Sequence, residues 1–533
     1  MEFVKQVFEH LNLKKKSVNS PTPISDPIIS DNDKLQEDIV DESKTFNKEA
    51  KNLKYQDCIL TNLISLKMTL AQNMIKLSKN EQSFAVKLSV LEDQLEKYEA
   101  LTQKEEDDSG DATVDVFCVI DISGSMCGEK LNQVKQSLKY LIELLKPEDR
   151  ISLVVFDDRA ELILAPKLIG KSREQILAIV DNIKSRGSTN IGAGIKVAFE
   201  EMLKRKSKNQ VTGVLLLSDG QDNCFFNRES NITKFYEAWD VKMKNEDFTL
   251  HTFGYGDGHD EKLMDNLAKR NGGKFYYVKD IETVSDTFVD CLAALYSVIG
   301  KNGRIKLNLK PNELFSEICF KRTYGPYFTG DKETERFIEL NNIIKGYKKD
   351  FIFEITVNGV KEPNCLVDEN VIKQLVSANL EVQNLSGISF NIVDVLEIKV
   401  CNEDDASEIV KSDDVDKDLI RVRGSEALEE AMDCAKRGDY EAGEMLMEKV
   451  EEECCRYDTD DFVVKMKENF TKNREMIKNE RMGISNDCNM QAYGRNIQNC
   501  YMEQESAPQF MKGAFENKTR QKYGDRLGKM KKC

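Results

Sequence analysis

Histidine and paired cysteines are scarce in this sequence, and their scarcity weighs against several kinds of site. The chain has three histidines, His10, His251 and His259, and none of its fourteen cysteines forms a Cys-x-x-Cys pair. A zinc knuckle needs such pairs, and a serine or cysteine nucleophile needs a histidine base. We therefore expect neither a zinc finger nor a histidine-dependent hydrolase.

Long apolar runs are also missing. The first residues, MEFVKQVFEHLNLKKK, are interrupted by charges and lack the apolar core and cleavage site of a secretory signal. No segment is long and apolar enough for a transmembrane segment. The cysteines are scattered, and Cys118 and Cys291 fall in apolar stretches where cysteine acts as a small hydrophobic residue. We expect a reduced, cytoplasmic protein.

Basic charge is in deficit over most of the chain. The sequence has 77 Lys and Arg against 93 Asp and Glu, a formal net charge of -16. This balance disfavours non-specific binding to nucleic acid, so no nucleic-acid partner is expected. The exception is a basic cluster near the C-terminus, formed by Lys512, Lys518, Arg520, Lys522, Arg526, Lys529, Lys531 and Lys532.

The most informative stretch is VDVFCVIDISGSMCG, Val114–Gly128. An apolar, β-branched run ends at Asp121, a small-residue loop carries Ser123 and Ser125, and residues 129–145 have helical spacing. This order of strand, loop and helix is typical of an open α/β sheet. Loops at the carboxyl ends of such strands form the ligand crevice.

Two later loops have the same character. Thr189 lies in GSTN before a helical pattern, and a second buried strand, LLLSDG, ends at Asp219. Carboxylate and hydroxyl oxygens suit Mg²⁺ or Mn²⁺, and a short loop needs help from other loops to complete an octahedral shell. The alternative is that these Asp and Ser residues only cap the helices that follow.

Asp121-Ile-Ser123-Gly-Ser125, with Thr189 and Asp219 following in order, resembles the metal-ion-dependent adhesion site of a von Willebrand factor type A (VWA) domain. The resemblance implies that Ser123, Ser125 and Thr189 supply hydroxyl ligands. It implies that Asp121 and Asp219 hold the metal directly or through water. It also implies that one position on the metal is left for an acidic side chain, Asp or Glu, of a protein partner.

Residues 112–300 alternate strand and helix patterns, as expected of a Rossmann-like, doubly wound, mainly parallel sheet with helices on both faces. An antiparallel edge strand, typical of VWA domains, is expected at 162–164. Other strands are predicted at 151–156, 214–217, 249–253 and 274–278, with helices at 173–184, 191–205, 233–245, 261–270 and 281–297.

Five further segments flank this α/β unit. A short helix and disordered linker are predicted for 1–45, and a long amphipathic helix for 46–111. After the α/β unit we expect a β-sandwich over 301–402, an α-helical hairpin over 403–480 and a basic, mobile tail over 481–533. In the long helix, apolar residues recur at steps of mostly three and four, at Leu63, Leu66, Leu70, Met74, Leu77, Phe84, Leu88, Leu91, Leu95 and Tyr98. It would either pair as a coiled coil in a homodimer or fold back on the globular part.

The succession of VWA domain, β-rich segment and helical hairpin resembles plant proteins that join a RING finger to a VWA domain. In those proteins the RING finger supplies ubiquitin ligase activity, and this sequence shows no RING finger. Aspartate-based phosphoryl transfer would want a carboxylate two residues after Asp121, where Ser123 stands. The loop GYGDGHD, which carries His259, lacks a phosphate-binding pattern and is predicted to be a plain turn.

The function expected from the sequence is that of a non-enzymatic scaffold. Its VWA adhesion site would bind a protein partner in a divalent-metal-dependent way. The alternative is a substrate adaptor of, or another component in, ubiquitin ligation.

Overall fold

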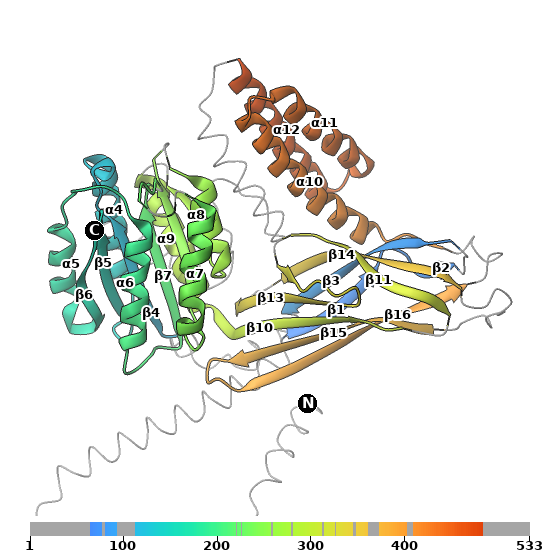
Figure 1. Ribbon diagram of the computed structural model, residues 1–533, viewed down its shortest axis with the longest axis horizontal. Helices are drawn as coiled ribbons and strands as arrows, with labels where there is room; N and C mark the ends of the chain where they lie inside the picture. The colour runs from blue at the N-terminus through green and yellow to red at the C-terminus, as the bar shows by residue number, and fades with distance from the viewer. Residues whose placement is uncertain are drawn as a thin grey trace, which may run out of the picture. The chain divides into compact units, whose positions relative to one another are not determined.

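The computed structural model describes residues 64–76, 80–92, 112–401 and 409–482, with short gaps inside the third range. These residues form three β-sheets and two sets of helices (Figure 1). The predicted helix and linker at 1–45, and the predicted tail apart from residues 481 and 482, lie outside the described residues.

One six-stranded sheet has the order β6-β5-β4-β7-β8-β9. Its strands are β4 (Val114–Asp121), β5 (Arg150–Phe156), β6 (Ala160–Leu168), β7 (Val211–Ser218), β8 (Thr249–Tyr255) and β9 (Phe275–Val278). All neighbours are parallel except β6, which pairs with β5 in the antiparallel direction. The predicted doubly wound sheet with an antiparallel edge is therefore confirmed.

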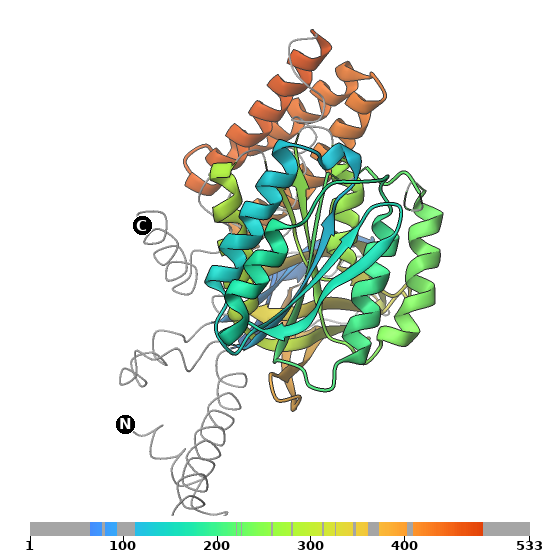
Figure 2. The same ribbon diagram turned by 90° about the vertical axis from the view of Figure 1, so that its left-hand side faces the viewer.

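Helices cover both faces of this sheet (Figure 2). Apolar side chains of α4, α5 and α9 pack in one core, and those of α6, α7 and α8 pack in the other. The bounds are α4 (Glu129–Leu144), α5 (Arg173–Asp181), α6 (Ile191–Lys204), α7 (Glu229–Met243), α8 (Glu261–Arg270) and α9 (Ile281–Tyr296). Because β4 and β7 are buried along their whole length, polar side chains collect where these strands end.

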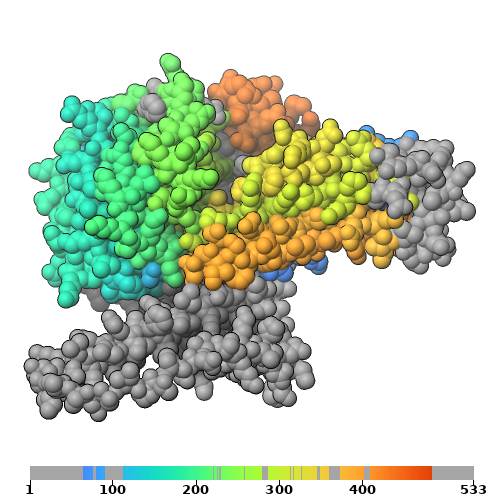
Figure 3. Space-filling model, turned by 60° about the horizontal axis from the view of Figure 1, so that its bottom comes forward, coloured from blue at the N-terminus to red at the C-terminus, as the bar shows by residue number. Residues whose placement is uncertain are grey.

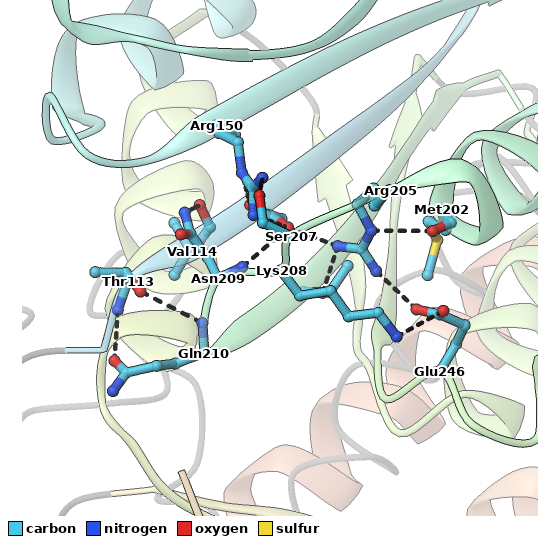
Figure 4. Close-up of polar contacts among 12 residues, drawn as sticks. Thr113, Val114, Arg150, Met202, Arg205, Ser207, Lys208, Asn209, Gln210 and Glu246 are labelled. Atoms are coloured by element: carbon cyan, nitrogen blue, oxygen red, sulfur yellow. Dashed lines mark hydrogen bonds and ion pairs between the residues drawn. The ribbon is translucent and has the colours of Figure 1, made fainter. Parts of the chain in front are cut away.

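A buried ion network lies at the amino-terminal end of β4, away from Asp121. The Arg205 guanidinium lies 2.6 Å from Asp115 Oδ2 and 2.8 Å from Glu246 Oε2. Arg150 Nε lies 2.7 Å from the other oxygen of Asp115. Figure 4 shows Arg205, Glu246 and Arg150 in this network. The network ties β4, β5, the end of α6 and the loop before β8 together at the base of the domain.

The other two sheets form a β-sandwich with the orders β1-β3-β14-β11 and β12-β13-β10-β15-β16-β2. Its surface combines residues from both sides of the α/β unit in the sequence, seen as blue, yellow and orange atoms in Figure 3. The strands are β1 (Ile64–Leu70), β2 (Met74–Lys76), β3 (Gln82–Glu92), β10 (Val298–Leu309), β11 (Phe315–Thr323), β12 (Phe328–Thr329), β13 (Glu335–Ile344), β14 (Lys348–Val360), β15 (Ile372–Asn384) and β16 (Ser389–Cys401). The predicted sandwich is present, and the α/β unit is inserted between its strands β3 and β10.

The predicted long helix over 46–111 is wrong wherever the structure describes it, because residues 64–70, 74–76 and 82–92 are strands. A step of four residues, as from Leu66 to Leu70, fits one turn of a helix and also two full repeats of a strand. The buried residues Ile64, Leu66, Met68 and Leu70 follow the strand period of two. The coiled-coil homodimer expected from this helix loses its structural basis.

The C-terminal helices are α10 (Asp413–Lys436), α11 (Tyr440–Cys454) and α12 (Asp461–Arg481), and they share one apolar core. The predicted hairpin corresponds to α10 and α11, while α12 was not predicted. Buried charges fasten α10 to the sandwich. Lys87 Nζ of β3 lies 2.5 Å from Asp418 Oδ2 and 3.1 Å from Asp350 Oδ2, and the fully buried Arg421 lies 2.8 Å from Asp418 Oδ1.

Candidate metal centre

Asp121 ends β4 and is held by hydrogen bonds on both carboxylate oxygens. The Ser123 amide donates to Oδ1 at 2.8 Å, and the Ser218 hydroxyl, at the end of β7, donates to Oδ2 at 2.5 Å. Asp121 is fully buried. Burial raises its pKa to about 6, and the negative charge of Asp219 contributes in the same direction. A fixed and poorly solvated carboxylate of this kind gains strongly from a nearby cation.

The loop after Asp121 brings two hydroxyls together. The Oγ atoms of Ser123 and Ser125 lie 3.0 Å apart and share a hydrogen bond. Ser123 is buried, whereas Ser125 is exposed on the 3₁₀ turn Gly124–Met126. The loop therefore has a buried oxygen beside Asp121 and a second oxygen at the surface.

The GSTN loop packs directly on this first loop. The amide of Gly124 donates to the carbonyl oxygen of Gly187 at 3.0 Å. Thr189 is buried, and its carbonyl oxygen accepts a hydrogen bond of 3.2 Å from the amide of Asn223 in the loop after β7. Thr189 thus lies in a loop that touches both of the others. Asn190 caps α6 by accepting from the Ala193 amide, so capping explains Asn190 and not Thr189.

Asp219 follows β7 and is buried. Its Oδ2 accepts a hydrogen bond of 2.9 Å from the ammonium of Lys130. Its Oδ1 is buried and has no hydrogen-bond partner among the described residues. A buried carboxylate oxygen without a donor is costly unless a cation or water satisfies it. A metal ion bound beside this oxygen would satisfy it.

The donor set fits a hard cation. Of the five ligands predicted from the sequence, Asp121 and Asp219 would contribute carboxylates, and Ser123, Ser125 and Thr189 would contribute hydroxyls. No group of three or more His, Cys, Asp or Glu that could hold a metal occurs within the described part of the chain. A set of two carboxylates and three hydroxyls matches the oxygen preference of Mg²⁺ and Mn²⁺ rather than that of a thiolate- or imidazole-binding metal.

Sequence reasoning missed a fourth loop at this site, the one after β8. Gly256 in this loop lies against the side chain of Lys130: a Cβ atom at Gly256 would come within 2.9 Å of Lys130 Cε. His259 Nδ1 donates to the Gly256 carbonyl oxygen at 2.7 Å, and burial lowers the pKa of His259. The run of glycines was the available signal, because Gly256 has a φ of 77° that glycine adopts without strain.

These loops belong to a domain of known family. A family model for the von Willebrand factor type A domain matches residues 115–290. Residues 115–290 form a VWA domain. VWA domains typically mediate protein–protein interactions and commonly bind Mg²⁺ or Mn²⁺.

Three curated relatives illustrate the range of proteins that share this domain. The chain is 26% identical over 249 residues to the uncharacterized protein YfbK of Escherichia coli, covering 46% of this chain and 42% of YfbK. It is 27% identical over 212 residues to the uncharacterized protein sll0103 of Synechocystis, covering 40% and 49%. It is 24% identical over 208 residues to the E3 ubiquitin-protein ligase WAV3 of Arabidopsis thaliana, covering 38% and 25%. The matches thus span less than half of each relative.

Two solved structures share the fold over a longer range. A von Willebrand factor type A protein from Catenulispora acidiphila superposes with a TM-score of 0.56 at 16% identity, covering 76% of this chain and 90% of that protein. The ArnB paralog VWA2 from Sulfolobus acidocaldarius superposes with a TM-score of 0.51 at 15% identity, covering 83% and 98%. The shared fold therefore extends beyond residues 115–290. Among the described helices, none is long and apolar enough to cross a membrane.

Proposed function

We propose that the VWA domain is a divalent-metal-dependent protein-binding module. Mg²⁺ or Mn²⁺ would be held by Asp121, Ser123, Ser125, Thr189 and Asp219. An Asp or Glu side chain of a protein partner would complete the coordination. The observation that carries this proposal is the buried Oδ1 of Asp219, which has no hydrogen-bond partner in the described part of the chain, near the fixed carboxylate of Asp121.

The chemistry of the ligands favours capture of a carboxylate over catalysis. Three of the five ligands are neutral hydroxyls, so the metal keeps much of its positive charge and gains from an added anionic ligand. Ser125 and Gly124 are exposed at the rim, where a partner can approach. His259 lies near the site, but its ring is buried against Phe275 and Tyr277 and donates to a backbone carbonyl. It is therefore poorly placed to act as a base on a bound substrate.

The rest of the chain suits a scaffold role in the cytoplasm. The buried ion cluster of Lys87, Asp418 and Arg421 fixes α10 on the sandwich, which gives the helices a defined surface to present. Cys118 and Cys291 are buried free thiols, in keeping with a reducing compartment.

Partner capture with and without metal tests the proposal. The full-length protein would be immobilised, and bound proteins would be compared in Mg²⁺, in excess chelator and after Mg²⁺ is restored. The partner is expected to be lost in chelator and recovered with Mg²⁺, and Asp121→Ala should not retain it. Arg159→Ala, at an 89% exposed side chain in the turn between β5 and β6, is the control and should retain it. Capture that is unchanged in chelator and in Asp121→Ala would refute the proposal.

A role in ubiquitin ligation is the second candidate, favoured by the likeness to WAV3. This chain would then act as a substrate adaptor or as a component of a ligase. Incubation of the purified protein with ubiquitin, activating enzyme and conjugating enzymes tests whether it is itself a ligase. Formation of ubiquitin chains that depends on this protein would support the second candidate, and their absence would leave only an adaptor role to be tested with a ligase added.

A further inference from the structure

Lys130 places a positive charge inside the proposed metal site. It stands in the first turn of α4, just after the loop that carries Ser123 and Ser125. Its Nζ lies 2.9 Å from Asp219 Oδ2, and the side chain of Asp219 is only 2% exposed while that of Lys130 is 31% exposed. The ammonium therefore reaches in from the surface to a buried carboxylate that the metal would also need.

A separate loop, the one after β8, contacts the side chain of this lysine. Gly256, in this loop, lies against the Lys130 side chain: a Cβ atom there would come within 2.9 Å of Lys130 Cε, so a larger residue would push the flexible end of the lysine aside. His259 Nδ1 holds the backbone of that loop by its hydrogen bond to the Gly256 carbonyl oxygen. The ion pair thus lies against a separate loop and joins Lys130 to a carboxylate whose side chain is only 2% exposed, which distinguishes it from a pair on an open surface.

The electrostatics explain what the lysine does without metal. Asp121 and Asp219 are both buried, so the ionised form of each carboxylate is energetically unfavourable without a counter-ion. Lys130 supplies one positive charge to the pair. A divalent cation between the same carboxylates would supply two charges and would repel an ammonium bound to Asp219.

Resting on the proposed metal site, we propose that Lys130 is a built-in counter-ion of Asp219 that competes with the divalent cation. In the metal-free protein it neutralises Asp219 and keeps the site folded. When the metal binds, the ammonium leaves Asp219 Oδ2. Lys130 therefore sets the affinity of the site for metal, at a lower value than the oxygen ligands alone would give.

Mn²⁺ titration of the full chain tests this proposal. Free Mn²⁺ would be measured by electron paramagnetic resonance for the wild type, Lys130→Met and Lys139→Met. Lys139 lies on the same helix in an exposed ion pair with Asp181, so its substitution is the matched control. Lys130→Met is expected to bind Mn²⁺ about fivefold more tightly or better, because the competing ion pair is gone, and Lys139→Met should match the wild type.

Thermal unfolding in chelator provides a second readout. Metal-free Lys130→Met should melt below the wild type because Asp219 has lost its counter-ion, and Mn²⁺ should raise its melting temperature by more than it raises that of the wild type. If Lys130→Met does not fold, Lys130→Gln, which keeps a polar group near Asp219, takes its place in both measurements.

The outcomes separate the two proposals. No Mn²⁺ binding by the wild type or by the variant would refute the metal site itself, and the role of Lys130 with it. Equal affinities, or weaker binding by the variant, would overturn the role of Lys130 while leaving the metal site intact. Tighter binding by Lys130→Met alone supports the proposal, including the case where wild-type binding is too weak to detect.

Discussion

Ser218 donates its hydroxyl hydrogen bond to Asp121 Oδ2 across the neighbouring strands β7 and β4. The contact fixes the orientation of the Asp121 carboxylate from a residue that is not itself one of the proposed ligands. The segment LLLSDG therefore contributes two residues to the site: Asp219 itself, and Ser218, which orients Asp121. Ser218 is fully buried, so the hydrogen bond is shielded from water.

Ser218→Ala is expected to weaken Mn²⁺ binding about tenfold, because Asp121 loses the donor that orients it and the loss of such a support typically costs about 10- to 100-fold in metal affinity. Mn²⁺ titration of the full chain measures the effect. Ser152→Ala is the matched control: Ser152 is a buried serine of the same sheet that donates to the Leu164 carbonyl oxygen, far from the site. Both variants should lose about 1 kcal/mol of stability, and only Ser218→Ala should lose affinity. Equal affinity in the two variants would contradict the role of Ser218.

The raised pKa of Asp121, about 6, predicts a pH dependence of stability in the metal-free protein. The folded state holds a proton on Asp121 that the unfolded state releases near pH 4. The stability that this gives is present at low pH and is lost as the pH rises through about 6. Between pH 5 and pH 7.5 the wild type should therefore lose about 1 kcal/mol relative to Asp121→Asn.

Urea unfolding in chelator across this pH range makes the comparison for the two proteins. Parallel curves would show that Asp121 does not titrate in this window. In saturating Mg²⁺ the trend should reverse for the wild type, because the metal binds the ionised carboxylate and its affinity rises with pH.

Arg205→Leu is expected to destabilise the VWA domain by about 3 kcal/mol, because it leaves the buried carboxylates of Asp115 and Glu246 without their shared partner. The network lies at the other end of β4 from the metal site. Mn²⁺ stoichiometry in the folded protein should therefore be unchanged. Arg159→Leu, whose side chain is 89% exposed, should change stability by about 0.5 kcal/mol or less. A small effect of Arg205→Leu in urea unfolding would contradict the structural role of the network.

Leu88→Ala tests the placement of residues 82–92 as a central strand of the sandwich. Leu88 is fully buried and pairs with Met68 of β1 and Phe351 of β14. Its truncation should cost about 2–5 kcal/mol. The unfolding midpoint should not depend on protein concentration, whereas a residue in a dimeric coiled coil would show such a dependence. Leu168→Ala, at an exposed position of β6, is the control and should have a small effect.

The α/β unit could be predicted from sequence because its signals are local. Each buried strand is a continuous apolar run and each helix has its own period, so element order alone gives the doubly wound sheet. The five proposed ligands also stand in short motifs, and the structure places the loops of Asp121, Thr189 and Asp219 in contact.

Contacts between residues that are far apart in the sequence could not be predicted in the same way. One of the two partners of β3 is β14, with Leu88 opposite Phe351, and nothing near Leu88 in the sequence reports that pairing. Lys130 occupies an ordinary polar position of an amphipathic helix, and its contact with Asp219 depends on a packing angle. The lysine contact was missed for this reason, whereas β1 and β3 were missed because their local pattern of apolar residues fits a helix as well as a strand.

The insertion of the VWA domain between β3 and β10 joins its last helix closely to the sandwich. On one side the connection is Ser297 alone, between the end of α9 and the start of β10. The amide of Ser297 donates to the carbonyl oxygen of Ala293, so this residue continues directly from α9. A rotation of α9 would therefore be passed to β10 through a single residue.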